Sequence, residues 1–253
     1  MIYLLPDDEI MFPDPRNGEP DGLFAAGGDL SPERLILAYQ HGIFPWFAFK
    51  PEHTRFVDNQ GKAMITWYCP MERFVIFPNK IHISHSMRQL INSKKYSVTF
   101  NKDFNGVIEH CSDLRIHHEY AWLGPEMVEA YKKLHTLHYA HSVEVWDNAT
   151  GALVGGLYGV AANSCFCGES MFSLVPSASK LALITLAQIL QNTPGTLIDC
   201  QFHTPHLESM GGERIDYEEY MKVMRGGKIN YFKKCSSCYY IINISLYLQK
   251  VFI

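Results

Sequence analysis

From about residue 66 to residue 201, short apolar segments alternate with longer amphipathic ones. The apolar segments are rich in β-branched and aromatic residues, which predicts strands. The predicted strands are Tyr96–Phe100, His141–Trp146, Leu153–Ala161, Cys165–Phe172 and Thr196–Gln201. The amphipathic segments predict helices over Ser84–Asn92, Phe104–Leu114, Pro125–Leu137 and Ser177–Gln191. Interleaved strands and helices of this kind are typical of an α+β or α/β-like domain.

The first sixty residues have a different texture, because proline, glycine and aspartate recur too often for long elements. One helix is predicted there. Ser31 is a good N-cap, Pro32 suits the first helical position, and Gly42 is a stop signal. Bulky aromatic residues, among them Phe44 and Trp46, follow directly. We therefore expect a small, turn-rich unit at the N-terminus.

Composition excludes several protein classes. With 253 residues, of which 47% are hydrophobic, the chain can bury a sizeable core, and disorder or a coiled coil is excluded. No apolar run approaches the roughly 20 residues of a membrane-spanning helix, and the acidic start lacks the features of a signal peptide. We expect a cytoplasmic protein without membrane association, whose seven cysteines are reduced.

The net charge of −4 hides a block-like distribution. Residues 1–72 carry 5 basic and 11 acidic side chains, and residues 103–221 carry 5 and 15. Residues 73–102 and residues 222–253 each carry 6 basic side chains and no acidic one. The first basic block is large enough to hold a few phosphates, although a solvated surface would have the same composition.

The predicted strand over residues 165–172 mixes polar and apolar residues. Strict alternation places Cys167, Glu169 and Met171 on one face, with Phe166 and Phe172 on the other. A carboxylate in so apolar a strand must be solvated, paired or functional, because burying it alone is costly. Glu169 is therefore a candidate site residue.

A second acid ends the predicted strand over residues 196–201. Asp199 and Gln201 are two residues apart, so alternation places them on one face. An acid and an amide side by side at a strand end can orient an amine and receive its proton. The alternative is that Asp199 caps the turn near Thr204.

Cofactor and metal signals are weak. The connection Leu174–Lys180, between a predicted strand and helix, contains no glycine, which disfavours a coenzyme A pyrophosphate loop. Cys235 and Cys238 form a single C-x-x-C pair without a second pair, and Cys165 and Cys167 lie on a strand. We predict neither a metal site nor a small cofactor.

Several motifs read together resemble one family, the leucyl/phenylalanyl-tRNA–protein transferases, from about residue 6 to residue 224. The matching stretches are Asp21–Leu23, Gly27–Leu30, Ala38–Tyr39, Gly42–Trp46, His141–Trp146, Leu153–Val160, Gly168–Ser173, Ala178–Lys180 and Ile198–Gln201. The resemblance implies an N-terminal domain (1–68), an acetyltransferase-like, GNAT-like domain with a mixed, mainly antiparallel sheet (69–224), and a tail (225–253) that the resemblance does not cover.

The resemblance also implies an activity. Family members transfer Leu, Phe or Met from aminoacyl-tRNA to the α-amino group of proteins that begin with Arg or Lys, which marks them for N-end rule degradation. No cofactor is needed because the ester to tRNA is already activated. The implied catalytic residues are Asp199 and Gln201. The implied substrate-binding residues are Glu169 at the pocket edge, Phe166, Leu157 and Met171 in the apolar pocket, and Trp46 and Trp122 near the terminal adenosine.

The family's tRNA-contacting cluster corresponds to the helix around Ile83–Lys95, where Arg88, Lys94 and Lys95 would contact phosphates. Other positions there that are often basic in relatives are neutral here, so we expect weaker tRNA binding from a monomeric enzyme. Two alternatives stay open on the sequence. They are an acetyl-coenzyme A-dependent N-acetyltransferase and a non-catalytic protein that binds tRNA or degradation signals.

Overall fold

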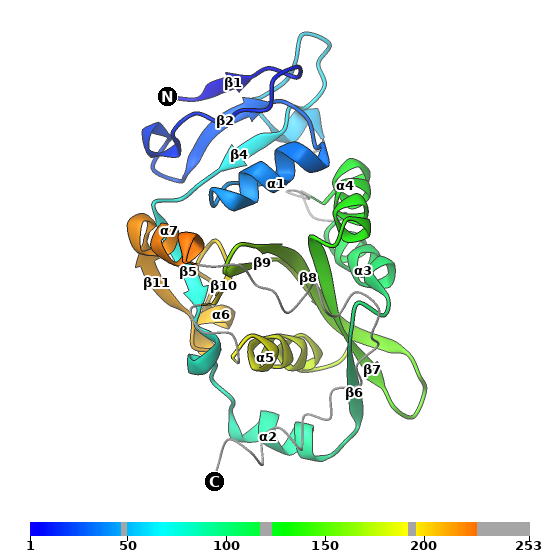
Figure 1. Ribbon diagram of the computed structural model, residues 1–253. Helices are drawn as coiled ribbons and strands as arrows, with labels where there is room; N and C mark the ends of the chain where they lie inside the picture. The colour runs from blue at the N-terminus through cyan, green and yellow to red at the C-terminus, as the bar shows by residue number, and fades with distance from the viewer. Residues whose placement is uncertain (47–49, 117–122, 192–195, 227–253) are drawn as a thin grey trace.

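The computed structural model describes residues 1–46, 50–116, 123–191 and 196–226. Within these residues the strands form two sheets, a small one near the N-terminus and a larger one that holds most of the chain (Figure 1). The α+β class expected from the sequence is confirmed. None of the helices in these ranges combines the length and the apolar character that crossing a membrane requires.

The small sheet is built from four short strands in the order β1-β2-β4-β3. They are β1 (Tyr3–Leu5), β2 (Leu23–Gly27), β3 (Phe44–Trp46) and β4 (Thr66–Tyr68). Helix α1 (Pro32–Gln40) connects β2 to β3 and begins as predicted, since the Ser31 hydroxyl accepts the backbone N–H of Arg34. Buried residues of α1 and β2 share one core cluster with the large sheet, so the two units pack directly on each other.

The large sheet has the order β11-β5-β10-β9-β8-β7-β6. Its strands are β5 (Glu72–Ile76), β6 (Tyr96–Phe100), β7 (Ala140–Asp147), β8 (Leu153–Ala162), β9 (Cys165–Ser173), β10 (Leu197–Asp199) and β11 (Glu213–Asp216). All neighbours are antiparallel except β9 and β10, which run parallel. The sheet is therefore mixed and mainly antiparallel, as expected.

Helices cover both faces of the large sheet (Figure 1). Helices α3 (Phe104–Ile116) and α4 (Pro125–Thr136) pack on the face that also meets α1. The opposite face packs against α5 (Ala178–Leu190) and contributes to one core with α2 (His85–Asn92). The remaining helical segments are α6 (Pro205–Ser209), α7 (Tyr217–Arg225) and the 3₁₀ turns Pro15–Asn17, Pro51–His53 and Pro78–Lys80.

Each strand and helix predicted from periodicity is present, with ends displaced by a few residues. The largest difference lies at the end of β10. This strand stops at Asp199, and Gln201 adopts a left-handed backbone with φ of 57°. The alternation that placed Asp199 and Gln201 on one face therefore does not hold, because Gln201 is no longer part of a pleated strand.

A β-bulge interrupts β9 at Glu169. Tyr158 of β8 pairs with Ser170, whereas the next residue of β8, Gly159, pairs with Gly168, so Glu169 is the extra residue. The bulge exchanges the two faces of the strand beyond this point. The prediction that Met171 shares a face with Cys167 is therefore wrong, since Met171 packs with the α5 core and Cys167 with the other.

Strands β9 and β10 separate just where the bulge begins. Their parallel pairing covers only Cys165–Cys167 of β9, although β9 continues to Ser173 along β8. A side chain added at Gly168 would meet only the carbonyl oxygen of Asp199, at 3.6 Å. The gap between the two strands is thus open beside Gly168, and the candidate site lies there.

This geometry predicts opposite effects at two paired glycines. A Cβ at Gly159 would lie 2.2 Å from the carbonyl oxygen of Cys167 and 2.5 Å from the Phe166 ring. Gly159→Ala should therefore lower the free energy of unfolding by about 1–3 kcal/mol, as overpacking does. Its partner variant, Gly168→Ala, has room and should change it by less than about 0.5 kcal/mol. Urea unfolding of both variants measures this, and equal losses would contradict the packing described here.

Candidate active site

An apolar pocket of about 250 Å³ opens where β9 and β10 separate. Its walls come from β8, β9, β10, α5 and the α6 segment. The lining residues are Leu157, Phe166, Gly168, Glu169, Ser170, Met171, Leu183, Leu186, Ile198, Cys200, Gln201, Thr204, His206 and Leu207. The volume lies below the roughly 300–1,000 Å³ of most ligand pockets, so it fits a single large side chain.

The structure brings together five of the residues that the sequence assigned to the site. Leu157, Phe166 and Met171 form apolar wall, while Glu169 and Gln201 lie in the same lining. Met171 reaches this wall only because of the bulge at Glu169, which turns it to the face of Phe166. An apolar wall of this kind suits an apolar side chain and leaves the polar groups of other side chains unpaired.

Glu169 ends a chain of buried hydroxyls that crosses from α1 to β9. The Tyr131 hydroxyl of α4 donates to Glu169 Oε2 at 2.8 Å, and it lies 2.7 Å from the Tyr39 hydroxyl of α1. Burial raises the pKa of Glu169 to about 7, against the hydrogen bonds from the tyrosines. Near neutral pH this carboxyl group is thus divided between its charged and neutral forms.

Asp199 does not line the apolar pocket, although its neighbour Ile198 does. It forms a fully buried ion pair with Arg73 of β5. Both side chains are at most 1% exposed. The Tyr220 hydroxyl of α7 donates to Asp199 Oδ2 at 3.0 Å, and Arg73 also donates to the carbonyl oxygen of Gly42 at 2.7 Å. Burial opposes the charge of Arg73, but the carboxylate of Asp199 keeps the pKa of its guanidinium well above the ordinary value.

Asp199 is connected to the pocket through the backbone of Gln201. Asp199 Oδ1 accepts the Gln201 backbone N–H at 2.9 Å, which holds Gln201 in its left-handed conformation. Residues other than glycine adopt this conformation at a cost and only where the surroundings enforce it. Asp199 and Gln201 are therefore linked as the sequence suggested, but only Gln201 lines the pocket.

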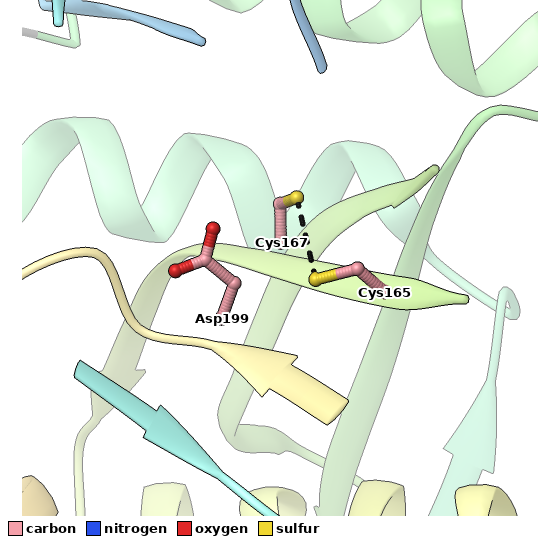
Figure 2. Close-up of side chains that lie close together, drawn as sticks. All are labelled: Cys165, Cys167 and Asp199. Carbon is pink, nitrogen blue, oxygen red and sulfur yellow. Dashed lines mark hydrogen bonds between the residues drawn. The ribbon is translucent and has the colours of Figure 1, made fainter. Parts of the chain in front are cut away.

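Asp199 also lies next to two thiols of β9, as Figure 2 shows. The Sγ atoms of Cys165 and Cys167 are 3.8 Å apart, and one ligand atom from each of the three residues falls within 4.8 Å. A metal ion would need thiolates here. The hydrogen bond with Cys165, together with burial, raises the pKa of Cys167 well above its usual range, and Arg73 already neutralises Asp199. This donor set is that of a packed core rather than a metal centre.

A second, larger cleft of about 760 Å³ is lined in part by Phe202, which follows the pocket residue Gln201 in the chain. Four aromatic residues line it, and they are Trp46, Phe56, Tyr68 and Phe202. The ring centroid of Trp46 lies 5.5 Å from that of Tyr68 and 5.3 Å from that of Phe202, and Trp46 is 39% exposed. Trp122, the other aromatic residue assigned from the sequence, lies outside the described residues.

A third cleft, of about 660 Å³, shares Phe202 and Asp21 with the aromatic one. Three carboxylates line it, from Asp21, Glu72 and Asp216. One basic side chain, Arg214, lies among them and pairs with Glu72 at 2.6 Å. The surplus of negative charge favours a cationic group in this cleft.

The candidate tRNA-binding residues are exposed and lie at or just after α2. Arg88 belongs to this helix, and Lys94 and Lys95 follow its end. Lys94 has a left-handed backbone with φ of 54°, which marks the turn into β6. None of the three residues lines the apolar pocket.

Sequence reasoning missed Arg73, Tyr220, Tyr39 and Tyr131, the residues that hold Asp199 and Glu169 in place. One signal was available. Arg73 directly precedes the apolar run Phe74–Phe77, and a charge beside such a run predicts a buried partner of opposite sign. The tyrosines gave no signal, because a tyrosine on a helix face is most often simply core.

Comparison with known proteins gives this geometry a context. The family model for leucyl/phenylalanyl-tRNA protein transferase matches residues 75–225, and the model for its N-terminal domain matches residues 28–71. A leucyl/phenylalanyl-tRNA–protein transferase of Flavobacterium psychrophilum is 45% identical over 86% of this chain and 97% of its own length. One of Pseudomonas fluorescens is 44% identical over 89% of this chain and 94% of its own.

These matches make the chain an aminoacyltransferase, an enzyme that takes an amino acid from tRNA and gives it to a protein. It belongs to the leucyl/phenylalanyl-tRNA–protein transferase family. Among solved structures, that of L-PGS from Bacillus licheniformis covers 90% of this chain and 70% of its own at a TM-score of 0.37 and 13% identity, a likeness too slight to bear on the function.

The ion pair between Arg73 and Asp199 should be strongly coupled. Arg73→Met leaves a buried carboxylate without its counter-charge, and Asp199→Asn leaves a buried guanidinium. Each should lower the free energy of unfolding by about 3–5 kcal/mol, whereas the double variant should lose clearly less than the sum. A double-mutant cycle by urea unfolding gives the coupling energy. Additive losses would show that the pair contributes only packing.

Glu169 should make stability depend on pH. In the unfolded chain the carboxyl group of Glu169 has the ordinary pKa of 4.5, whereas burial raises its pKa in the folded protein to about 7. Between these values the folded state binds more protons, so this residue lowers the free energy of unfolding as the pH rises. Glu169→Gln cannot titrate. The free energy of unfolding of this variant, relative to that of the native protein, should therefore increase from about pH 4.5 to about pH 7 and stay constant above pH 7. Urea unfolding at a series of pH values tests this, and a constant difference would contradict the raised pKa.

Proposed function

We propose that this enzyme transfers Leu, Phe or Met from aminoacyl-tRNA to the N-terminal α-amino group of proteins that begin with Arg or Lys. The observation that carries the proposal is the meeting of three sites at residues 200–202. The apolar pocket borders Cys200 and Gln201, and both the aromatic and the acidic cleft border Phe202. Each site suits one part of the two substrates.

The donor would occupy the pocket and the aromatic cleft. Its side chain would lie against Leu157, Phe166 and Met171, which present no polar group to bind. The terminal adenosine would stack on Trp46, where base stacking contributes roughly 1–3 kcal/mol. Arg88, Lys94 and Lys95 would contact tRNA phosphates, as the family resemblance suggests. The glycine-free connection between β9 and α5 favours this donor over acetyl-coenzyme A.

The acceptor would enter from the acidic cleft. An N-terminal Arg or Lys side chain would be attracted to Asp21, Glu72 and Asp216, so that its α-amine lies near Gln201. Such proteins are the ones that N-end rule degradation removes, and we propose a cytoplasmic location for the reaction. The pocket and both clefts are lined by residues of one chain, so we propose that the enzyme acts as a monomer.

In the proposed reaction, the acceptor amine attacks the ester carbonyl carbon, the bond to the ribose oxygen breaks, and the amine proton ends on that oxygen. Gln201 Oε1 would accept a hydrogen bond from the attacking amine and orient it. Asp199 acts through Gln201, since its carboxylate accepts the Gln201 backbone N–H and otherwise pairs with Arg73. Asp199 is therefore a positioning residue in this mechanism.

The test is transfer of labelled Phe or Leu from charged tRNA to a peptide that begins with Arg, compared with one that begins with Ala. The native protein should label the first peptide and not the second. Gln201→Ala should lower kcat by about a hundredfold. Gln60→Ala, in an exposed turn, is the matched control and should leave the rate unchanged.

Two outcomes contradict different parts of the proposal. Absence of transfer by the native protein would contradict the function. Undiminished transfer by Gln201→Ala together with Asp199→Asn would leave the function standing and overturn the mechanism. Thermal unfolding of each variant, measured alongside, separates loss of chemistry from loss of fold.

A further inference from the structure

Three residues that line the pocket each carry a buried polar atom that has no hydrogen-bond partner among the described residues. These atoms are Glu169 Oε1, Gln201 Nε2 and His206 Nε2. A buried polar atom left in this state costs roughly 1–3 kcal/mol. Three of them around one small apolar pocket therefore indicate a ligand that carries its own donors and acceptors to this place.

His206 is the member of this set that neither the sequence nor the proposed mechanism has used. It is the second residue of the α6 segment, whose N-cap Thr204 accepts the Leu207 N–H at its hydroxyl at 3.2 Å. This cap fixes the segment so that both His206 and Leu207 line the pocket. The imidazole is thus held at the wall by the same short loop that carries Gln201.

The imidazole is suited to accept a hydrogen bond. Burial, together with the nearby charge of Lys180, lowers the pKa of His206, so the ring is neutral near pH 7. A neutral imidazole has one nitrogen that accepts. In the charged form of Glu169, Oε1 is a second acceptor, and Gln201 Nε2 is a donor.

The aminoacyl group of the proposed donor has the complementary pattern. Its Leu, Phe or Met side chain has no hydrogen-bond donor, so the only donors of the aminoacyl group are those of its α-amine. Its ester carbonyl oxygen is an acceptor, which matches the free Nε2 of Gln201. One amine between two acceptors, and one carbonyl oxygen opposite a donor, would satisfy all three atoms.

We propose that His206 is a further substrate-binding residue, which accepts a hydrogen bond at Nε2 from the α-amino group of the donor amino acid while the side chain fills the apolar pocket. The inference rests on the proposed function, because it takes an aminoacyl ester as the donor. The recognition is of a free amine and is independent of which apolar side chain accompanies it.

The experiment compares two donors that differ only in this amine. One tRNA carries Phe, and the other carries 3-phenylpropionate, which has the same side chain and ester but no α-amine. His206→Phe should lower kcat/KM about tenfold with the Phe donor, the effect of losing one hydrogen bond. With the phenylpropionyl donor, His206→Phe should leave kcat/KM nearly unchanged.

His203→Phe is the matched control. His203 is three residues away on the same loop, but its Nε2 lies 3.0 Å from Glu208 and it does not line the pocket. Any effect of this control should be equal for the two donors. Equal losses for His206→Phe with both donors would assign His206 a purely structural role and overturn the proposal.

Equilibrium binding of the two charged tRNAs, measured on the same variants, gives the comparison without turnover. His206→Phe should weaken binding of the Phe-carrying tRNA and not of the phenylpropionyl one. A native protein that transfers nothing would count against the proposed function alone. Equal affinity of the native protein and His206→Phe for the Phe-carrying tRNA would overturn the role of His206.

Discussion

The rest of the structure depends on the ion pair between Arg73 and Asp199. A buried pair stabilises a protein only when its remaining hydrogen bonds are satisfied, and here they are. Arg73 also bonds the carbonyl oxygen of Gly42, which follows α1, and Asp199 also bonds Tyr220 of α7 and the backbone of Gln201. One pair of charges therefore joins the N-terminal unit, the central strands and the last described helix at the edge of the pocket.

The pocket itself arises from two local departures from regular strand geometry. The bulge at Glu169 turns Met171 toward the apolar wall, and the left-handed Gln201 ends β10 so that the two strands part. Each departure costs some stability. The Tyr131 hydroxyl holds the side chain of Glu169, and Asp199 holds Gln201 by accepting its backbone N–H. The pocket is therefore formed by the sheet itself, at the place where β9 and β10 depart from regular strand geometry.

This explains what the sequence could and could not predict. Hydrophobic periodicity predicts the elements from His85 to Asp199, where apolar strands alternate with amphipathic helices. It misses β1 to β5 and β11, which have three to five residues each and lie outside this alternation, so that neither their own pattern nor their neighbours mark them as strands. Alternation also fails at Glu169 and Gln201 for a physical reason, because a bulge or a turn changes the face on which every later side chain lies.

Selection of the donor follows from the same architecture. A pocket of about 250 Å³ with apolar walls favours apolar over polar side chains, but one methylene more or less is worth only about 1–3 kcal/mol. Such a pocket cannot by itself discriminate finely among apolar amino acids. In the proposed reaction, stacking of the terminal adenosine on Trp46 would add affinity but no discrimination, because this nucleotide is the same in every donor. Any finer choice would then depend on the parts of the tRNA that differ between donors.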